Sequence, residues 1–330
     1  MNRRRLNPFL FIIVLMFILQ FLSPPLTSAA EKLNYRLKWL FNASVVGDIW
    51  ATDQGLFSEA GLDVLVKEGG PERDAIKELE LGQAQFGVAS ADQVIRALSK
   101  GSPVVVVAQL FQINPLHWIY RSDNMKIDRL DDFKGKIIGI TYGGNDETIM
   151  RTLLAKSNIT ESDVKLFSVR YDFTPFFTKK VDIWPCYINS QGPILKQKLA
   201  DAGEGVAFFN PSDFGVKFVA NSVVTSRKML ENNPDTVKKF TTALLSGWRI
   251  SLDPANRDIV LETLKKYDKN TPPDILALQL DLTRDLIKPD AAVEIGYIDV
   301  DAWKQTEEVM IVQKVISSPV SVEKALQPQF

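Results

Sequence analysis

Residues 135–156, GKIIGITYGGNDETIMRTLLAK, contain the pattern that decides the fold. The segment 135–140 is apolar and is entered through Gly135, which is typical of a short buried strand. The turn 142–145 contains two glycines, and the following residues to about Lys156 predict a helix. A strand that passes through a glycine-rich turn into a helix indicates an α/β fold with a largely parallel sheet.

The same alternation occurs before this segment. Strands are predicted at 33–40, 61–66, 86–89 and 103–110, with helices at 42–54, after the turn 68–71 and from Ser90. Strands that alternate with helices at this spacing form βαβ units. We therefore expect mixed, mostly parallel sheets.

The alternation restarts in the second part of the chain, which predicts two lobes. Further strands are expected at 164–169 and 181–187, the segment 216–224 returns to the first lobe, and the pattern is helical from Lys228 onward. One lobe would contain residues 31–118 plus 219–330 and the other residues 119–218. Two crossing strands would then form a hinge about which the lobes close.

The first thirty residues predict export. Arg3, Arg4 and Arg5 precede an apolar run over 9–22, and the small residues 28–30 follow it. This is the pattern of a cleaved signal peptide in 1–30, with cleavage after Ala30 or nearby, and it indicates a periplasmic location. An uncleaved anchor is the alternative, but the run is shorter than the roughly 20 apolar residues that span a bilayer.

Composition excludes several classes of protein. The chain has one cysteine and one histidine, which excludes a disulfide framework and a Cys/His metal centre. Loss of the three arginines in 1–30 changes the formal net charge from -1 to -4, and no segment concentrates lysine and arginine. We therefore expect no nucleic-acid partner and no metal. We also expect no cofactor and a monomeric protein.

Several short motifs resemble a known family. They are Lys38-Trp39, Gly55-Leu56-Phe57, Gly61-Leu62-Asp63-Val64, Gly87-Val88-Ala89-Ser90, Leu130 to Lys136 and Val181-Asp182-Ile183-Trp184. In this order the chain resembles the type II periplasmic substrate-binding proteins of ABC transporters, in the branch for thiamine pyrimidine precursors, sulfonates and nitrate. The resemblance implies a two-lobe type II fold, a permease as partner and a transport receptor that is not an enzyme.

Polar, aromatic and glycine residues follow the predicted strands. In open α/β sheets, ligands bind beyond the carboxyl ends of the strands, so we expect these residues to bind the ligand. The predicted ligand-binding residues are Trp39, Asn42, Gly69, Ser90, Tyr142, Gly144, Asn145, Trp184, Tyr187 and Asn189.

The residue types at these positions favour a flat nitrogen heterocycle. Aromatic rings such as Trp39, Trp184 and Tyr187 stack on a flat ligand, and side-chain amides form hydrogen bonds with the donors and acceptors on its edge. A basic residue for an anion is absent from the loops considered. We therefore favour a thiamine pyrimidine precursor or a related ring, including a flavin. A sulfonate or nitrate receptor of the same fold remains the alternative.

An enzyme that makes the thiamine pyrimidine is the alternative of another class. A relative with that activity has a cysteine-rich segment and uses a histidine, whereas this chain has only Cys186 and His117. Cys186 lies in an apolar strand, which predicts a buried and unreactive thiol. We expect no catalytic residues.

Overall fold

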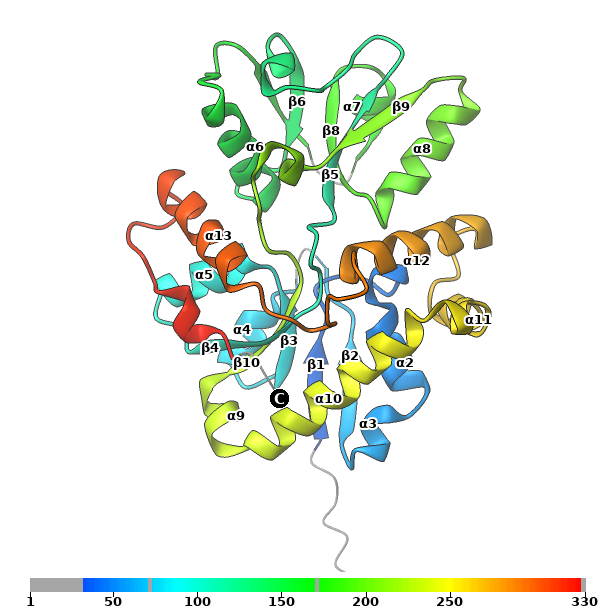
Figure 1. The fold of residues 1–330 in the computed structure, drawn as a ribbon, viewed down its shortest axis with the longest axis vertical. Helices are drawn as coiled ribbons and strands as arrows, with labels where there is room; N and C mark the ends of the chain where they lie inside the picture. Colours follow the sequence, from blue (N-terminus) through cyan, green and yellow to red (C-terminus); the bar gives the residue numbers. More distant parts are fainter. Residues whose placement is uncertain (1–31, 71–72, 170–171, 328–330) are drawn as a thin grey trace, which may run out of the picture. The chain divides into compact units, whose positions relative to one another are not determined.

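Two mixed sheets with helices packed against them form the framework of the chain (Figure 1). The computed structural model describes residues 32–70, 73–169 and 172–327, so the predicted signal peptide lies outside the described residues. The strand order is β2-β1-β3-β10-β4 in the first sheet and β7-β6-β8-β5-β9 in the second. The predicted α/β class is therefore confirmed.

Most predicted strands begin and end within two residues of the predicted limits, but the first ends at Arg36 instead of 40, and the last overlaps only the end of the segment 216–224. The first sheet contains β1 (Lys32–Arg36), β2 (Asp63–Lys67), β3 (Phe86–Ala89), β4 (Val104–Gln109) and β10 (Ser222–Ser226). The second contains β5 (Leu116–Arg121), β6 (Ile137–Ile140), β7 (Lys165–Ser168), β8 (Ile183–Tyr187) and β9 (Val206–Phe209). β5 and β9 were not predicted.

Antiparallel pairs take a larger share of both sheets than predicted. β1 is parallel to β2 and β3, and β6 is parallel to β7 and β8. β10 is antiparallel to β3 and β4, and β5 is antiparallel to β8 and β9. β5 and β10 are the strands that the chain enters on changing sheets. Each begins at the edge where the parallel strands end, so it must run in the opposite direction.

The helices also match the predicted pattern. They are α2 (Val46–Asp53), α3 (Leu56–Glu59), α4 (Ala75–Glu80), α5 (Ala91–Ser99), α6 (Asn145–Lys156), α7 (Thr174–Phe177), α8 (Gln191–Asp201), α9 (Arg227–Asn232), α10 (Pro234–Ser251), α11 (Arg257–Tyr267), α12 (Pro273–Ile287) and α13 (Val300–Val312). The 3-10 turns are η1 (Ala43–Val45), η2 (Leu130–Phe133), η3 (Pro211–Phe214), η4 (Pro254–Asn256) and η5 (Val322–Ala325). In the described part of the chain, none of these helices has the length and apolar character that a bilayer span requires.

An aromatic stack fixes the long helix α10 on the first sheet. The ring of Phe240 lies 3.7 Å from that of Phe86 and 5.2 Å from that of Phe57, centroid to centroid, and both pairs are stacked with nearly parallel planes. The three rings are almost completely buried. Such pairs contribute about 0.5–1.5 kcal/mol beyond the burial of their apolar area.

The chain changes sheets in the segments 110–115 and 210–221, which are hydrogen-bonded to each other. Leu110 N and Phe111 N donate to the carbonyl oxygen of Asn221 at 3.1 and 3.3 Å. Asn114 Nδ2 donates to Phe218 O at 2.7 Å. The two segments therefore form one paired connection between the sheets. Division of the chain into two lobes that move about it remains a proposal.

Candidate functional site

A cavity of about 340 Å³ lies where parallel strands of both sheets end. From the first sheet, the segment after β1 contributes Lys38, Trp39 and Ser44, and Asn221 precedes β10. The other lining residues are Leu116, Thr141, Gly144, Asn145, Asp146, Val169, Phe173, Trp184, Pro185, Cys186, Tyr187, Ser190 and Gln191. This is the edge at which ligands bind in open α/β sheets.

Half of the predicted ligand-binding residues line this cavity. They are Trp39, Gly144, Asn145, Trp184 and Tyr187. Trp39 comes from the first sheet and the other four from the second, because β6 and β8 end on the opposite side of the cavity. The structure therefore brings together residues that are far apart in the sequence.

Asn42, Ser90 and Gly69 lie outside the lining and have structural roles. Asn42 Oδ1 accepts from Ser44 N at 2.8 Å and begins η1. Ser90 is almost completely buried and caps α5. A Cβ at Gly69 would lie 2.1 Å from the carbonyl oxygen of Leu37, so only glycine fits there. Each of these residues ends or begins an element at the correct edge without reaching the cavity.

Tyr142 and Asn189 also lie outside the lining, for opposite reasons. Tyr142 is 55% exposed. Asn189 is completely buried, and its Nδ2 donates to Thr283 Oγ1 on α12 at 3.0 Å. The position of a residue after a strand identified the edge of the sheet but not the direction of the side chain.

The lining includes polar residues that the sequence did not single out as ligand contacts. Lys38 is half-buried beside Trp39, and its place in the lining corrects the expectation that the loops around the ligand carry no basic residue. Gln191 begins α8, and its Oε1 accepts from Tyr187 N at 3.0 Å. Asn221 lies in the second crossing segment. Lys38 was within a motif used for the resemblance, whereas no sequence signal marked Asn221.

The aromatic residues of the cavity differ in exposure. Trp184 is only 1% exposed, and its ring lies 5.7 Å from Phe173 and 6.1 Å from Phe176, so it is mainly a core residue. Trp39 and Tyr187 are half-buried and come from opposite sheets. These two rings are the ones best placed to contact a ligand from both sides.

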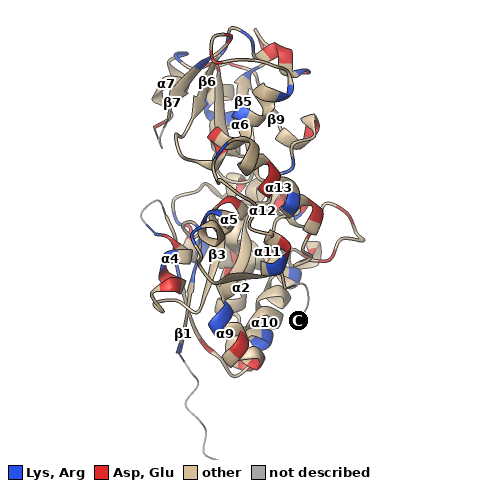
Figure 2. Ribbon diagram, turned by 90° about the vertical axis from the view of Figure 1, so that its left-hand side faces the viewer, with Lys and Arg blue, Asp and Glu red and all other residues tan. Residues whose placement is uncertain are grey.

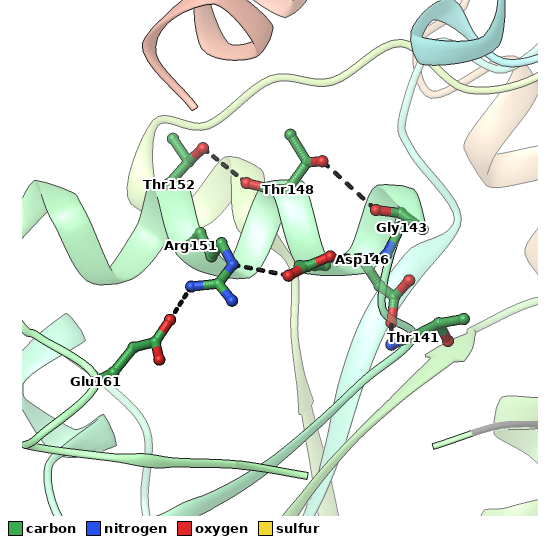
Figure 3. A network of polar contacts seen from close by, with 9 residues as sticks. Thr141, Gly143, Asp146, Thr148, Arg151, Thr152 and Glu161 are labelled. Atoms are coloured by element: carbon green, nitrogen blue, oxygen red, sulfur yellow. Dashed lines mark hydrogen bonds and ion pairs between the residues drawn. The ribbon is translucent and has the colours of Figure 1, made fainter. Parts of the chain in front are cut away.

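A polar network occupies the N-terminal end of α6 (Figure 3). Asp146 Oδ2 accepts from Thr141 N at 2.6 Å, and Glu147 accepts from Gly143 N at 2.7 Å and from Arg151 Nε at 2.9 Å. Burial raises the pKa of Asp146 to about 6, although its hydrogen bonds act in the opposite direction. The carboxylate is therefore mostly ionised at pH 7. A helix N-terminus favours an anion, and here the chain supplies its own.

Cys186 and His117 do not form a nucleophilic pair. They are partners in the register of β8 and β5, but burial raises the pKa of the thiol far above its ordinary value. His117 Nδ1 lies 3.1 Å from Pro115 O, its Nε2 lies 3.2 Å from Asn210 Nδ2, and burial lowers its pKa. Both ring nitrogens are thus already engaged. Among residues 32–70, 73–169 and 172–327 there is no group of three His, Cys, Asp or Glu side chains that could hold a metal.

Charged residues are mixed over both sheets. In Figure 2, Lys and Arg lie among Asp and Glu on the described ribbon, and neither sign is gathered in one stripe there.

The fold is that of the periplasmic binding proteins. The aliphatic sulphonate-binding protein SsuA of Escherichia coli matches with a TM-score of 0.70 and 17% identity, covering 91% of this chain and 93% of that one. The desulfurization enzyme DSZB has the same fold, with a TM-score of 0.60, 13% identity and coverage of 90% and 96%. Proteins with this fold therefore include both receptors and an enzyme, and the fold alone does not determine the function.

The chain belongs to the NMT1/THI5 like family, whose model matches residues 42–256. A formylaminopyrimidine-binding protein of Halalkalibacterium halodurans is 25% identical over 305 residues, which are 90% of each chain. The riboflavin-binding protein RibY of Chloroflexus aurantiacus is 24% identical over 321 residues, covering 93% of this chain and 88% of RibY. The predicted resemblance to substrate-binding proteins is thus confirmed.

Proposed function

We propose that this chain is the substrate-binding component of an ABC importer and that it binds a flat nitrogen heterocycle, a thiamine pyrimidine precursor or a related ring. One observation carries the proposal: Trp39 and Tyr187 reach the same cavity from opposite sheets, together with the amides of Asn145, Gln191 and Asn221. Rings hold a flat ligand by stacking, and amides pair with the donors and acceptors on its edge.

The size of the cavity favours a single ring over a flavin. Its volume of about 340 Å³ is at the low end of the range for ligand pockets, roughly 300–1,000 Å³. Both kinds of ligand occur in the names of relatives, formylaminopyrimidine in one and riboflavin in the other. A pyrimidine fits the smaller volume.

The charge at the N-terminal end of α6 favours a ligand that donates hydrogen bonds. An anionic ligand in this part of the cavity would face the carboxylate of Asp146, whereas an amino group or ring N–H would be attracted to it. An aminopyrimidine has such a donor beside an acceptor nitrogen.

A sulfonate or another anion is the second candidate, and Lys38 is the observation that favours it. Its ammonium group belongs to a residue of the lining. A charge-assisted hydrogen bond from lysine to a sulfonate is stronger than a neutral one. Lys38 and Asp146 therefore support different ligands, and the affinity for each must be compared directly.

Hinge closure is the mechanism that we propose. A ligand that contacts residues of both sheets stabilises the closed form by its higher affinity for that form. The lobes would be the two sheets with their helices, moving about the paired segments 110–115 and 210–221. The boundary proposed from the sequence, 31–118 plus 219–330 against 119–218, moves toward the N-terminus because residues 116–118 belong to β5 of the second sheet. The protein would be exported to the periplasm, deliver its ligand to a permease and perform no reaction.

Thermal unfolding with added ligand tests the proposal. Three ligands are compared: 4-amino-2-methylpyrimidine, riboflavin and ethanesulfonate. A ligand at 100 times its Kd stabilises the folded protein by about 2.7 kcal/mol, so the correct one raises the melting temperature. We expect the pyrimidine to raise the melting temperature of wild type and of Tyr142→Ala, a substitution outside the lining, but not that of Tyr187→Ala. A rise with ethanesulfonate alone would support the anion receptor instead.

A further inference from the structure

Asn221 lines the cavity from the second crossing segment. It is 6% exposed, and its Oδ1 is buried without a hydrogen-bond partner in the described part of the chain. A buried amide oxygen without a donor is unfavourable. An unsatisfied polar atom at a cavity is therefore a feature that a ligand would correct.

The backbone of the same residue holds the two crossing segments together. Its carbonyl oxygen accepts from Leu110 N at 3.1 Å and from Phe111 N at 3.3 Å. These bonds fix the position of Asn221 at the connection between the sheets. A ligand contact made by its side chain is thus made next to the segments that would rotate on closure.

We propose that the carboxamide of Asn221 determines specificity by pairing with an adjacent donor and acceptor on the ligand, the amino group and ring nitrogen of an aminopyrimidine. The amide oxygen accepts from the amino group, and the amide nitrogen donates to the ring nitrogen. This inference rests on the proposed function. It adds which groups of the ligand the site recognises. A site built for such a pair discriminates strongly against a ring that lacks it.

The experiment compares wild type with Asn221→Leu by calorimetry and thermal unfolding. The probes are 4-amino-2-methylpyrimidine and 2-methylpyrimidine, which lacks the amino group. We expect wild type to prefer the amino compound at least tenfold and Asn221→Leu to lose this preference. Because the leucine removes an unpaired polar group, the melting temperature of the unliganded variant should rise or stay the same.

Asn114→Leu is the matched control. Asn114 is in the first crossing segment, outside the lining, and its side chain both donates to Phe218 O and accepts from Leu116 N at 2.8 Å. This variant should have a lower melting temperature without ligand. A similar loss for Asn221→Leu would overturn the inference, whichever ligand binds, because it would indicate a structural role.

If Asn221→Leu prefers the amino compound as strongly as wild type does, the inference is also overturned, while the proposed function stands. If wild type binds neither pyrimidine, the proposed function fails, and so does the proposed pairing of Asn221 with the amino group and ring nitrogen. The melting temperatures of the unliganded variants would still decide whether Asn221 has a structural role.

Discussion

Asn189 Nδ2 donates to Thr283 Oγ1 at 3.0 Å, which joins the loop after β8 in the second sheet to helix α12. Close by, Gln279 Nε2 of α12 donates to Ser190 O at 2.7 Å. Ser190 lines the cavity, so the second of these bonds holds a residue of the lining. Asn189 and Gln279 are buried, and the connection between the second sheet and the C-terminal helices is therefore specific.

Thr283→Val should destabilise the folded protein by about 1–3 kcal/mol, because it leaves the buried amide of Asn189 without an acceptor. Denaturant unfolding measures the change. Thr241→Val is the control, since Thr241 is also buried but its hydroxyl has no partner in the described part of the chain. Equal effects of the two substitutions would contradict the role of the hydrogen bond.

Stability should decrease as the pH rises through about 7, in part because of Asp48. This residue is completely buried, Tyr35 OH donates to its Oδ1 at 2.5 Å, and burial raises its pKa from 3.8 to about 7. The folded state thus binds the proton more tightly than the unfolded state. The resulting stabilisation is fully present below about pH 4 and is lost as the pH rises through about 7.

Asp48→Asn removes this titration and isolates it from that of Asp146, whose pKa is raised in the same direction. The difference in unfolding free energy between wild type and variant, measured from pH 4 to 8, should change by a few kcal/mol. A difference that is constant with pH would show that Asp48 does not titrate as described.

Lys38→Met tests which charge of the cavity matters. If the ligand is a heterocycle read by amides, the Kd for 4-amino-2-methylpyrimidine should change less than about threefold, because the lysine makes no strong contact with a neutral ring. Isothermal titration calorimetry gives the Kd. An anion receptor predicts instead that Lys38→Met binds ethanesulfonate at least tenfold more weakly than wild type and that the wild-type affinity for ethanesulfonate depends strongly on salt.

Cys186 should be unreactive in the folded protein. The residue is 4% exposed, and burial raises the pKa of its thiol, so little thiolate forms at neutral pH. Iodoacetamide at pH 8 should label the protein only after denaturation, as seen by mass spectrometry. Rapid labelling of the native protein would indicate an accessible nucleophile and would reopen the possibility of an enzyme.

The sequence predicted those parts of the fold that depend on local pattern. The strand, turn and helix over 135–156 occur as β6 and α6, and Gly144 and Asn145 line the cavity. Apolar runs and turn residues determine such units within a few residues of chain. The edge of the sheet that holds the cavity followed from the order of these units.

The remaining features depend on contacts between distant residues. The residue pattern of Leu116 to Arg121 does not indicate that β5 is antiparallel to β8, because the direction of a strand depends on where the chain enters the sheet. Asn189 and Asn221 are both asparagines near strand ends, yet one faces α12 and the other the cavity. Their directions are set by packing that no local pattern contains.

Native mass spectrometry of the gently purified protein tests the central claim most directly. The account predicts a bound molecule with the mass of a small nitrogen heterocycle, present in wild type and Tyr142→Ala and absent from Tyr187→Ala. A bound sulfonate, or a heterocycle that Tyr187→Ala retains at the same occupancy, would contradict it.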